Sequence, residues 1–225
     1  MFSKPARWAD LALIGMTVIW GATFVVVKRA LDDASPLLFV ALRFSAAAAV
    51  LAILYRDHLR GAGASARAGI LCGVFLFLGY AYQTVGLRLT TAAKSAFITG
   101  LSVVMVPLLG ALVYRVWPHL AEAIGVVIAT AGLALLTLPA ASVRFQDAPP
   151  PGPGDLLSLA CAAGFAAHIV ALGHFSTRHA FQRLAVWQVG TVAALALAGC
   201  WWMEEPRFRP TPELWMALLV TSLLP

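Results

Sequence analysis

The sequence predicts an all-α, polytopic helical membrane protein, and three observations point to this fold class. Of the 225 residues, 61% are hydrophobic and 12% are charged. A soluble domain carries about 25% charged residues, so this chain has too few to cover a surface in water. Its apolar residues come in runs of about 17 to 20, the length of helix that crosses about 30 Å of hydrocarbon. The runs show no alternation of period two, which excludes the strands of a membrane barrel.

Seven runs are long enough to be complete spans, and an eighth begins close to the last residue. Backbone polar groups find no water in hydrocarbon, so each span is expected to be a helix. The seven spans are Leu11–Val27, Pro36–Tyr55, Gly69–Val85, Ala92–Val113, Leu120–Leu138, Leu156–Leu172 and Leu184–Trp202, and the partial eighth is Leu214–Pro225.

The first span, Leu11–Val27, follows Lys4 and Arg7 and could be taken for a secretory signal. Its apolar core is longer than that of such a signal, which has about 7–15 residues. Lys28 follows the span where a small-residue cleavage site would stand. We therefore expect a span that is retained.

Trp20 and Thr23 lie in the middle of the first span, and Arg43 lies seven residues into the second. Trp20 is too deep for an interfacial aromatic belt, so it either forms a cavity wall for a flat ligand or packs opposite glycines. The charge of Arg43 costs at least about 2.5–3.5 kcal/mol at mid-helix. Arg43 must therefore face a cavity, pair with another group, or extend toward the lipid headgroups.

The third span contains Gly69 and Gly73 in a Gly-x-x-x-Gly pattern, which indicates close helix packing. Further along, Tyr80, Gln83 and Thr84 form a polar cluster. Tyr80 could belong to an aromatic belt, whereas the amide of Gln83 has four hydrogen-bonding positions that need partners.

The fourth span carries a hydroxyl stripe, which consists of Thr91, Ser95, Thr99 and Ser102. Their spacings place these side chains on one helix face. Hydroxyls on one face bond either a solute or a neighbouring helix, and both uses stay open for Ser95 and Thr99. Pro107 is expected to kink this span.

Charged residues near the starts of spans have simple explanations. Lys94, at the start of the fourth span, is expected to extend toward the membrane surface. Glu122 lies in the first turn of the fifth span, where it complements the helix dipole. The centres of the spans contain no Asp or Glu, so the sequence gives no support to carboxylate-driven proton coupling.

Two polar residues interrupt the later spans. His168 lies deep in the sixth, where it either relays protons, since imidazole titrates near neutrality, or bonds a backbone carbonyl. Gln188 lies in the seventh, 145 residues after Arg43.

The segment that begins at Asp155 repeats the pattern that begins at Asp10. At this offset of 145, Trp20 aligns with Phe165 and Thr23 with His168. Many transporters are built from such repeats, and an odd number of spans per unit inverts the second unit. The expected organisation is a five-helix unit over residues 1–139, a proline-rich crossover loop over 140–154 and an incomplete second unit over 155–225, as part of a protein with ten helices.

Several stretches follow one another in an order and spacing that point to one family. They are Trp20–Phe24 with Lys28, Pro36–Phe44, Gly86–Leu101, Pro107–Leu109, and Gly154–Leu157 with Gln188. In these stretches the chain resembles the drug/metabolite transporter superfamily, and specifically its EamA-type members. The resemblance implies a multi-pass carrier of the bacterial inner (plasma) membrane, with a central cavity for amino acids, metabolites or drugs. The chain departs from the family near Val116, where a Glu often closes the fourth helix.

The net charge and the cysteine content limit the classes of partner and cofactor that the sequence supports. The net charge of +6 comes from basic residues scattered over short loops, which topology explains better than nucleic-acid binding. The loop charges favour an N-terminus on the inner side. The three cysteines lie inside apolar runs without metal-ligand spacing. We expect no cofactor and no metal, and as partners a small-molecule substrate, the lipid bilayer and, as a further candidate, a second copy of the chain in a homodimer.

These features favour a carrier that moves small organic solutes by alternating access. The alternatives are an inactive or regulatory membrane fragment and an intramembrane enzyme, which would need a cluster of catalytic residues that the sequence lacks. The expected solute-binding residues are Trp20, Thr23, Arg43, Tyr80, Gln83, Ser95, Thr99, His168 and Gln188.

Overall fold

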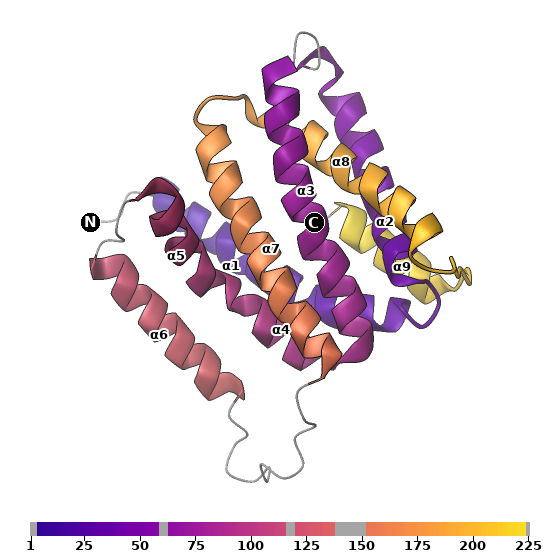
Figure 1. Ribbon diagram of the computed structural model, residues 1–225, viewed down its shortest axis with the longest axis horizontal. Helices are drawn as coiled ribbons and strands as arrows, with labels where there is room; N and C mark the ends of the chain where they lie inside the picture. Colours follow the sequence, from indigo (N-terminus) through magenta and orange to yellow (C-terminus); the bar gives the residue numbers. More distant parts are fainter. Residues whose placement is uncertain (1–3, 59–62, 116–119, 138–151, 224–225) are drawn as a thin grey trace.

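The computed structural model describes residues 4–58, 63–115, 120–137 and 152–223. Most of the predicted crossover loop lies outside these residues, as do the side chains of Asp10 and Glu122. The described residues form a helical bundle (Figure 1). Its helices are α1 (Lys4–Ala30), α2 (Pro36–Leu54), the short η1 (Arg56–His58), α3 (Gly63–Leu89), α4 (Ala92–Gly100), α5 (Ser102–Tyr114), α6 (Leu120–Thr137), α7 (Pro153–Ser176), α8 (Phe181–Trp202) and α9 (Pro212–Leu223).

Membrane-length helices confirm the predicted fold class. Five helical stretches of the described chain are long and apolar enough to cross a bilayer, with mean hydropathies between 1.6 and 2.4. They are α2, α3, the α4–α5 unit, α7 and α8. Large apolar side chains such as Leu112 and Trp201 are about three-quarters exposed, as expected for side chains that face lipid. The chain is a polytopic helical membrane protein, while the total of ten spans stays a prediction.

Side-chain contacts define two ends of the bundle, here called the Asp155 end and the His58 end. At the Asp155 end, Lys94 Nζ of α4 lies 2.6 Å from Asp155 Oδ2 of α7. The end of α1 lies there too, because Lys28 Nζ donates to the carbonyl of Leu87, near the end of α3, at 2.7 Å. At the His58 end, Arg183 of α8 donates to the carbonyl of His58 at 2.8 Å.

Corresponding helices of the two proposed units run in opposite directions. α1 ends at the Asp155 end, where α7 begins. α2 begins at this same end, and α8 ends there. The segment after α8 contacts the segment before α2, because the Arg209 N–H donates to the Asp33 carbonyl at 2.8 Å. An inverted repeat requires these directions. The unit boundaries and the two-fold relation themselves stay predictions.

Glycines let α3 approach both α7 and α8 closely. A Cβ atom on Gly73 would lie 2.6 Å from Thr191 Cβ and 2.7 Å from the carbonyl oxygen of Gln188, both on α8. A Cβ on Gly164 of α7 would lie 2.9 Å from the backbone nitrogen of Gly79 on α3. The Gly-x-x-x-Gly pattern therefore is a packing motif for α8, and other glycines make the close approach of α3 to α7.

The fourth predicted span is interrupted at Leu101, not at Pro107. The Leu101 N–H donates to the carbonyl of Ile98 at 3.1 Å, a tight turn that separates α4 from α5. Pro107 lies inside α5, which continues to Tyr114. The kink at Pro107 stays a prediction, and the interruption of this span at Leu101 was not predicted.

Candidate functional site

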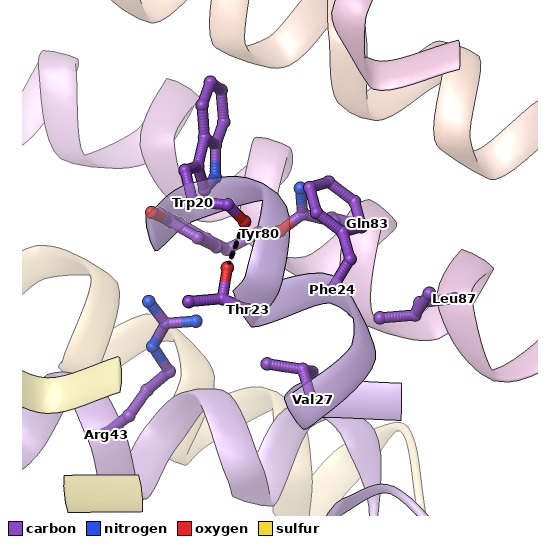
Figure 2. A pocket seen from close by; sticks show the side chains of 8 residues that line it. All are labelled: Trp20, Thr23, Phe24, Val27, Arg43, Tyr80, Gln83 and Leu87. Carbon is purple, nitrogen blue, oxygen red and sulfur yellow. Dashed lines mark hydrogen bonds between the residues drawn. The ribbon is translucent and has the colours of Figure 1, made fainter. Parts of the chain in front are cut away.

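A narrow pocket lies among α1, α2 and α3, and we call it the Arg43 pocket. The space there that the centre of a water-sized sphere can occupy is about 20 Å³, close to the room that one water molecule needs. Figure 2 shows the side chains that line it, which are Trp20, Thr23, Phe24 and Val27 of α1, Arg43 of α2, and Tyr80, Gln83 and Leu87 of α3.

Arg43 is buried in this pocket, with 6% of its surface exposed. Its guanidinium carbon lies 5.0 Å from the ring centre of Phe44 and 4.7 Å from that of Tyr80. Such cation–π contacts partly stabilise a desolvated guanidinium. Among the described residues, no carboxylate forms an ion pair with Arg43. The structure thus places Arg43 toward the bundle interior and excludes the lipid-facing alternative.

The hydrogen bonds of the pocket leave the amide of Gln83 incomplete. Gln83 is 7% exposed, and its Nε2 has no hydrogen-bond partner in the described part of the chain. Thr23 Oγ1 donates to the carbonyl of Trp20 at 2.6 Å. Thr84 Oγ1 donates to the carbonyl of Tyr80 at 2.7 Å, and so is satisfied within its own helix.

A second, larger pocket adjoins the first and is called the His168 pocket. It measures about 290 Å³. Trp20 and Tyr80 line both pockets, so they form the boundary between the two. Its lining comprises Met16, Thr17 and Trp20 of α1, Leu76 and Tyr80 of α3, and Phe165, His168 and Ile169 of α7.

Aromatic rings of the three elements contact one another at this boundary. The ring centres of Trp20 and Phe165 are 6.1 Å apart, and those of Tyr80 and Phe165 are 5.0 Å apart, both edge to face. Trp20 and Phe165 are the pair that the 145-residue offset aligns. The two proposed units therefore contribute equivalent positions to one pocket, and the repeat was the signal for Phe165, which was not among the predicted site residues.

His168 bonds a backbone carbonyl, which is one of its two predicted alternatives, and the proton relay stays a prediction. Its Nδ1 lies 3.0 Å from the carbonyl oxygen of Cys72 on α3. A carbonyl only accepts hydrogen bonds, so Nδ1 carries the proton, and Nε2 of the neutral ring is an acceptor. The same side chain lines the His168 pocket. The carbonyl bond fixes the ring at the wall of that pocket.

Ser95 and Thr99 do not line either pocket, which corrects the prediction that they join the other site residues. Both are almost fully buried against α7. Ser158 Oγ donates to Ser95 Oγ at 3.0 Å, and Thr99 Oγ1 lies 3.7 Å from Cys161 Sγ. Ser95 and Thr99 thus pack α4 against α7, because a neighbouring helix satisfies these groups as well as a solute would.

Gln188 also lies apart from the two pockets. It contacts α3 at Gly73, and its Oε1 is buried without a hydrogen-bond partner among the described residues. An offset of 145 residues relates Gln188 to Arg43, but Gln188 does not line the Arg43 pocket.

One polar cluster was missed, at the Asp155 end. Asp155 accepts hydrogen bonds from Thr90 Oγ1 at 2.8 Å and from the Gly152 N–H at 2.9 Å, besides its ion pair with Lys94. The predicted topology could have indicated this cluster. It places the starts of the fourth and sixth spans on the same side of the membrane, and these starts carry opposite charges. Lys94 was expected to extend toward the membrane surface. In the structure it pairs with the Asp155 carboxylate instead.

Comparison with known proteins gives concordant matches. Residues 7–138 match the profile of the EamA-like transporter family. An uncharacterized transporter of Archaeoglobus fulgidus is 36% identical over 181 residues, which cover 80% of this chain and 54% of that protein. The chain thus spans about half the length of this curated relative.

A crystal structure of a protein whose description gives no function shares the fold. It has a TM-score of 0.64 at 20% identity and covers 93% of this chain and 74% of its own. The family match covers more than half of the sequence and includes the first-unit residues of both pockets. The polytopic helical architecture and this match together show that the chain belongs to the EamA-like transporter family.

Proposed function

We propose that this protein is a carrier for small organic solutes, which works by alternating access between two inverted five-helix units. We place it in the plasma membrane, the inner membrane of a bacterium, and we assign it no catalytic step. Membership in a family of transporters supports the general function. The solute class and the mechanism are our proposal.

The observation that carries this proposal is the pair of adjoining pockets with a shared aromatic boundary. Helices of the first unit supply Trp20, Arg43 and Tyr80, and α7 of the second unit supplies Phe165 and His168. Sites of alternating-access carriers lie between their repeats. A lining of rings and a few buried polar groups suits a small amphiphilic solute, because rings bind its apolar part and polar groups orient it.

The test is a solute screen on the full-length protein in liposomes. Purified protein is reconstituted, and counterflow is measured for labelled amino acids, metabolites and drugs, with protein-free liposomes as the blank. We expect saturable exchange of at least one small organic solute. If none exchanges while the protein is folded and correctly inserted, the carrier proposal is wrong.

Two tryptophan variants link exchange to the pockets. Trp20→Ala removes the shared wall, and we expect it to raise the KM for the exchanged solute up to about tenfold, since an aromatic contact contributes about 0.5–1.5 kcal/mol beyond its buried area. Trp201 is 74% exposed on α8, so Trp201→Ala is the matched control and should leave KM unchanged. Equal KM values for the two variants would place the solute elsewhere.

A further inference from the structure

We infer that the Arg43 pocket binds the carboxylate of the solute, so that this protein carries small organic carboxylates with a flat apolar group. The inference rests on the proposed carrier function and makes its substrate class specific. It starts from a charge that the described protein leaves uncompensated.

The charge of Arg43 is permanent and has no acidic partner within the described parts of the chain. A guanidinium keeps its proton under all ordinary conditions. The pocket lining contains no Asp or Glu, and the described ion pairs, Arg56–Asp57 and Lys94–Asp155, involve other residues. Rings at 4.7 and 5.0 Å are weaker partners than an anion. A ligand with negative charge completes this site.

The hydrogen-bonding inventory points the same way. Arg43 offers only donors, and the orphaned atom of Gln83 is Nε2, a donor as well. The hydroxyl of Thr23 already donates to a backbone carbonyl. Arg43 already bonds the Tyr80 side chain, whereas Gln83 Nε2 has no partner among the described residues. A carboxylate is acceptor-only, so one of its oxygens matches the Gln83 donor and the other the guanidinium.

Size and depth favour a carboxylate over a phosphate or a lipid headgroup. The open space of about 20 Å³ has no room for a tetrahedral phosphate, and a planar carboxylate that meets the flat guanidinium needs the least widening of it. Arg43 is seven residues from the start of α2, or about 10 Å along the helix axis. Its side chain is nearly closed to the outside, so a headgroup at the membrane surface is too far away.

The rest of the solute is assigned to the neighbouring His168 pocket. Trp20 and Tyr80 line both spaces, so a solute with its carboxylate at Arg43 extends past these rings. The larger pocket is bounded by Leu76, Phe165 and Ile169, with His168 as a polar neighbour. This lining suits a flat apolar group of the size of a benzene or indole ring.

The experiment compares carboxylates with their uncharged amides on the full-length protein. The probes are phenylacetate, 3-phenylpropionate and indole-3-acetate, each beside its primary amide, and phenyl phosphate. Binding in detergent is measured by calorimetry, and counterflow in liposomes is measured for every probe that binds. We expect at least one carboxylate to bind about tenfold or more tightly than its amide and than phenyl phosphate.

Arginine variants then test the contact itself. Arg43→Gln should abolish the preference for the carboxylate over the amide, and Arg43→Lys should retain part of it, because lysine keeps the charge without the planar fork. Arg88 is exposed at the end of α3, so Arg88→Gln removes the same charge and should leave the preference intact. A gel-filtration profile and an unfolding curve for each variant confirm that it is folded.

The outcomes separate the inference from the carrier proposal. If amides bind as well as carboxylates, if no carboxylate binds, or if Arg43→Gln keeps the preference, the carboxylate assignment is overturned, even where the broad screen finds transported neutral or cationic solutes. Tighter binding of phenyl phosphate overturns the choice of carboxylate over phosphate. If the broad screen finds no exchange at all, the carrier proposal fails.

Discussion

We expect the fold to be as stable without the charge of Arg43 as with it. A charge at mid-helix in a membrane costs at least about 2.5–3.5 kcal/mol, and its two ring contacts return about 2 kcal/mol. We therefore expect Arg43→Gln to leave the midpoint of thermal unfolding of the full-length protein unchanged or raised. A lower midpoint would show that Arg43 stabilises the bundle and has a structural role.

Thr99 provides the contrasting case, because its hydroxyl faces α7 and neither pocket. Thr99→Val keeps the shape and removes a weak contact to Cys161, with Oγ1 and Sγ 3.7 Å apart. We expect a loss of less than about 1 kcal/mol in the free energy of unfolding. Counterflow of any solute that the screen finds should be unchanged. A variant that is well expressed but inactive would show that Thr99 belongs to the solute-binding site.

Part of the site could be predicted from single residues. A buried charge, an amide or a large aromatic ring in the middle of a span needs a specific partner, which marks Arg43, Gln83 and Trp20. The structure brings them together with Thr23 and Tyr80. Ser95 and Thr99 could not be assigned in this way. A hydroxyl needs only one partner, and helical spacing reveals the face on which it lies but not which helix covers that face.

At the scale of elements, the glycines of α3 control how closely the helices pack. Gly73→Ala would bring a Cβ to 2.7 Å from a backbone oxygen of α8, which neither helix can avoid without moving. We expect a lower unfolding midpoint and poorer expression of the full-length protein. The measurement is thermal unfolding in detergent.

The matched control lies on the partner helix. Gly190 of α8 has open space around its Cβ position within the described structure. Alanine is about 1 kcal/mol more favourable than glycine inside a helix, so Gly190→Ala should raise the midpoint slightly. If one methyl group lowers the unfolding midpoint at Gly73 and raises it at Gly190, helix packing is the cause of the difference. A Gly73→Ala variant as stable as the original protein would contradict the close approach of α3 to α8.

Element positions were predicted well and element ends less well. The second span was expected at Pro36–Tyr55, and α2 occupies Pro36–Leu54, because proline marks the first turn. α3 and α7 extend several residues beyond their predicted spans. Hydropathy ends at the edge of the hydrocarbon, whereas helical hydrogen bonds continue into the interface. The turn at Leu101 has no comparable local signal in the sequence.

At the scale of the whole molecule, helix directions can be tested by chemical labelling. In a background without Cys72, Cys161 and Cys200, single cysteines replace Asp57 and Thr177 near the His58 end, or Asp32 and Glu205 near the Asp155 end. All four positions are exposed. A membrane-impermeant maleimide should label the first pair from one face of the membrane and the second pair from the other.

This pattern requires α2 and α8 to cross in opposite directions, as the proposed inversion does. With the N-terminus inside, Asp57→Cys and Thr177→Cys should react only from the inner face. Labelling of Asp32→Cys and Glu205→Cys from opposite faces would contradict the described arrangement.

The close contacts of α3 have a consequence for how such a carrier changes shape. α3 belongs to the first unit, yet its glycines hold it against α7 and α8 of the second, and α8 also packs along α2. These four helices pack closely together across the proposed unit boundary, so we expect the proposed alternating access to move the helices around them more than the four helices themselves. α1 packs more loosely, with Leu11, Ile14 and Val18 each more than half exposed. If the proposed carrier function is right, we therefore expect α1 to be the wall that moves to admit a solute, with Trp20 and Thr23 on it and Arg43 on the more tightly packed α2.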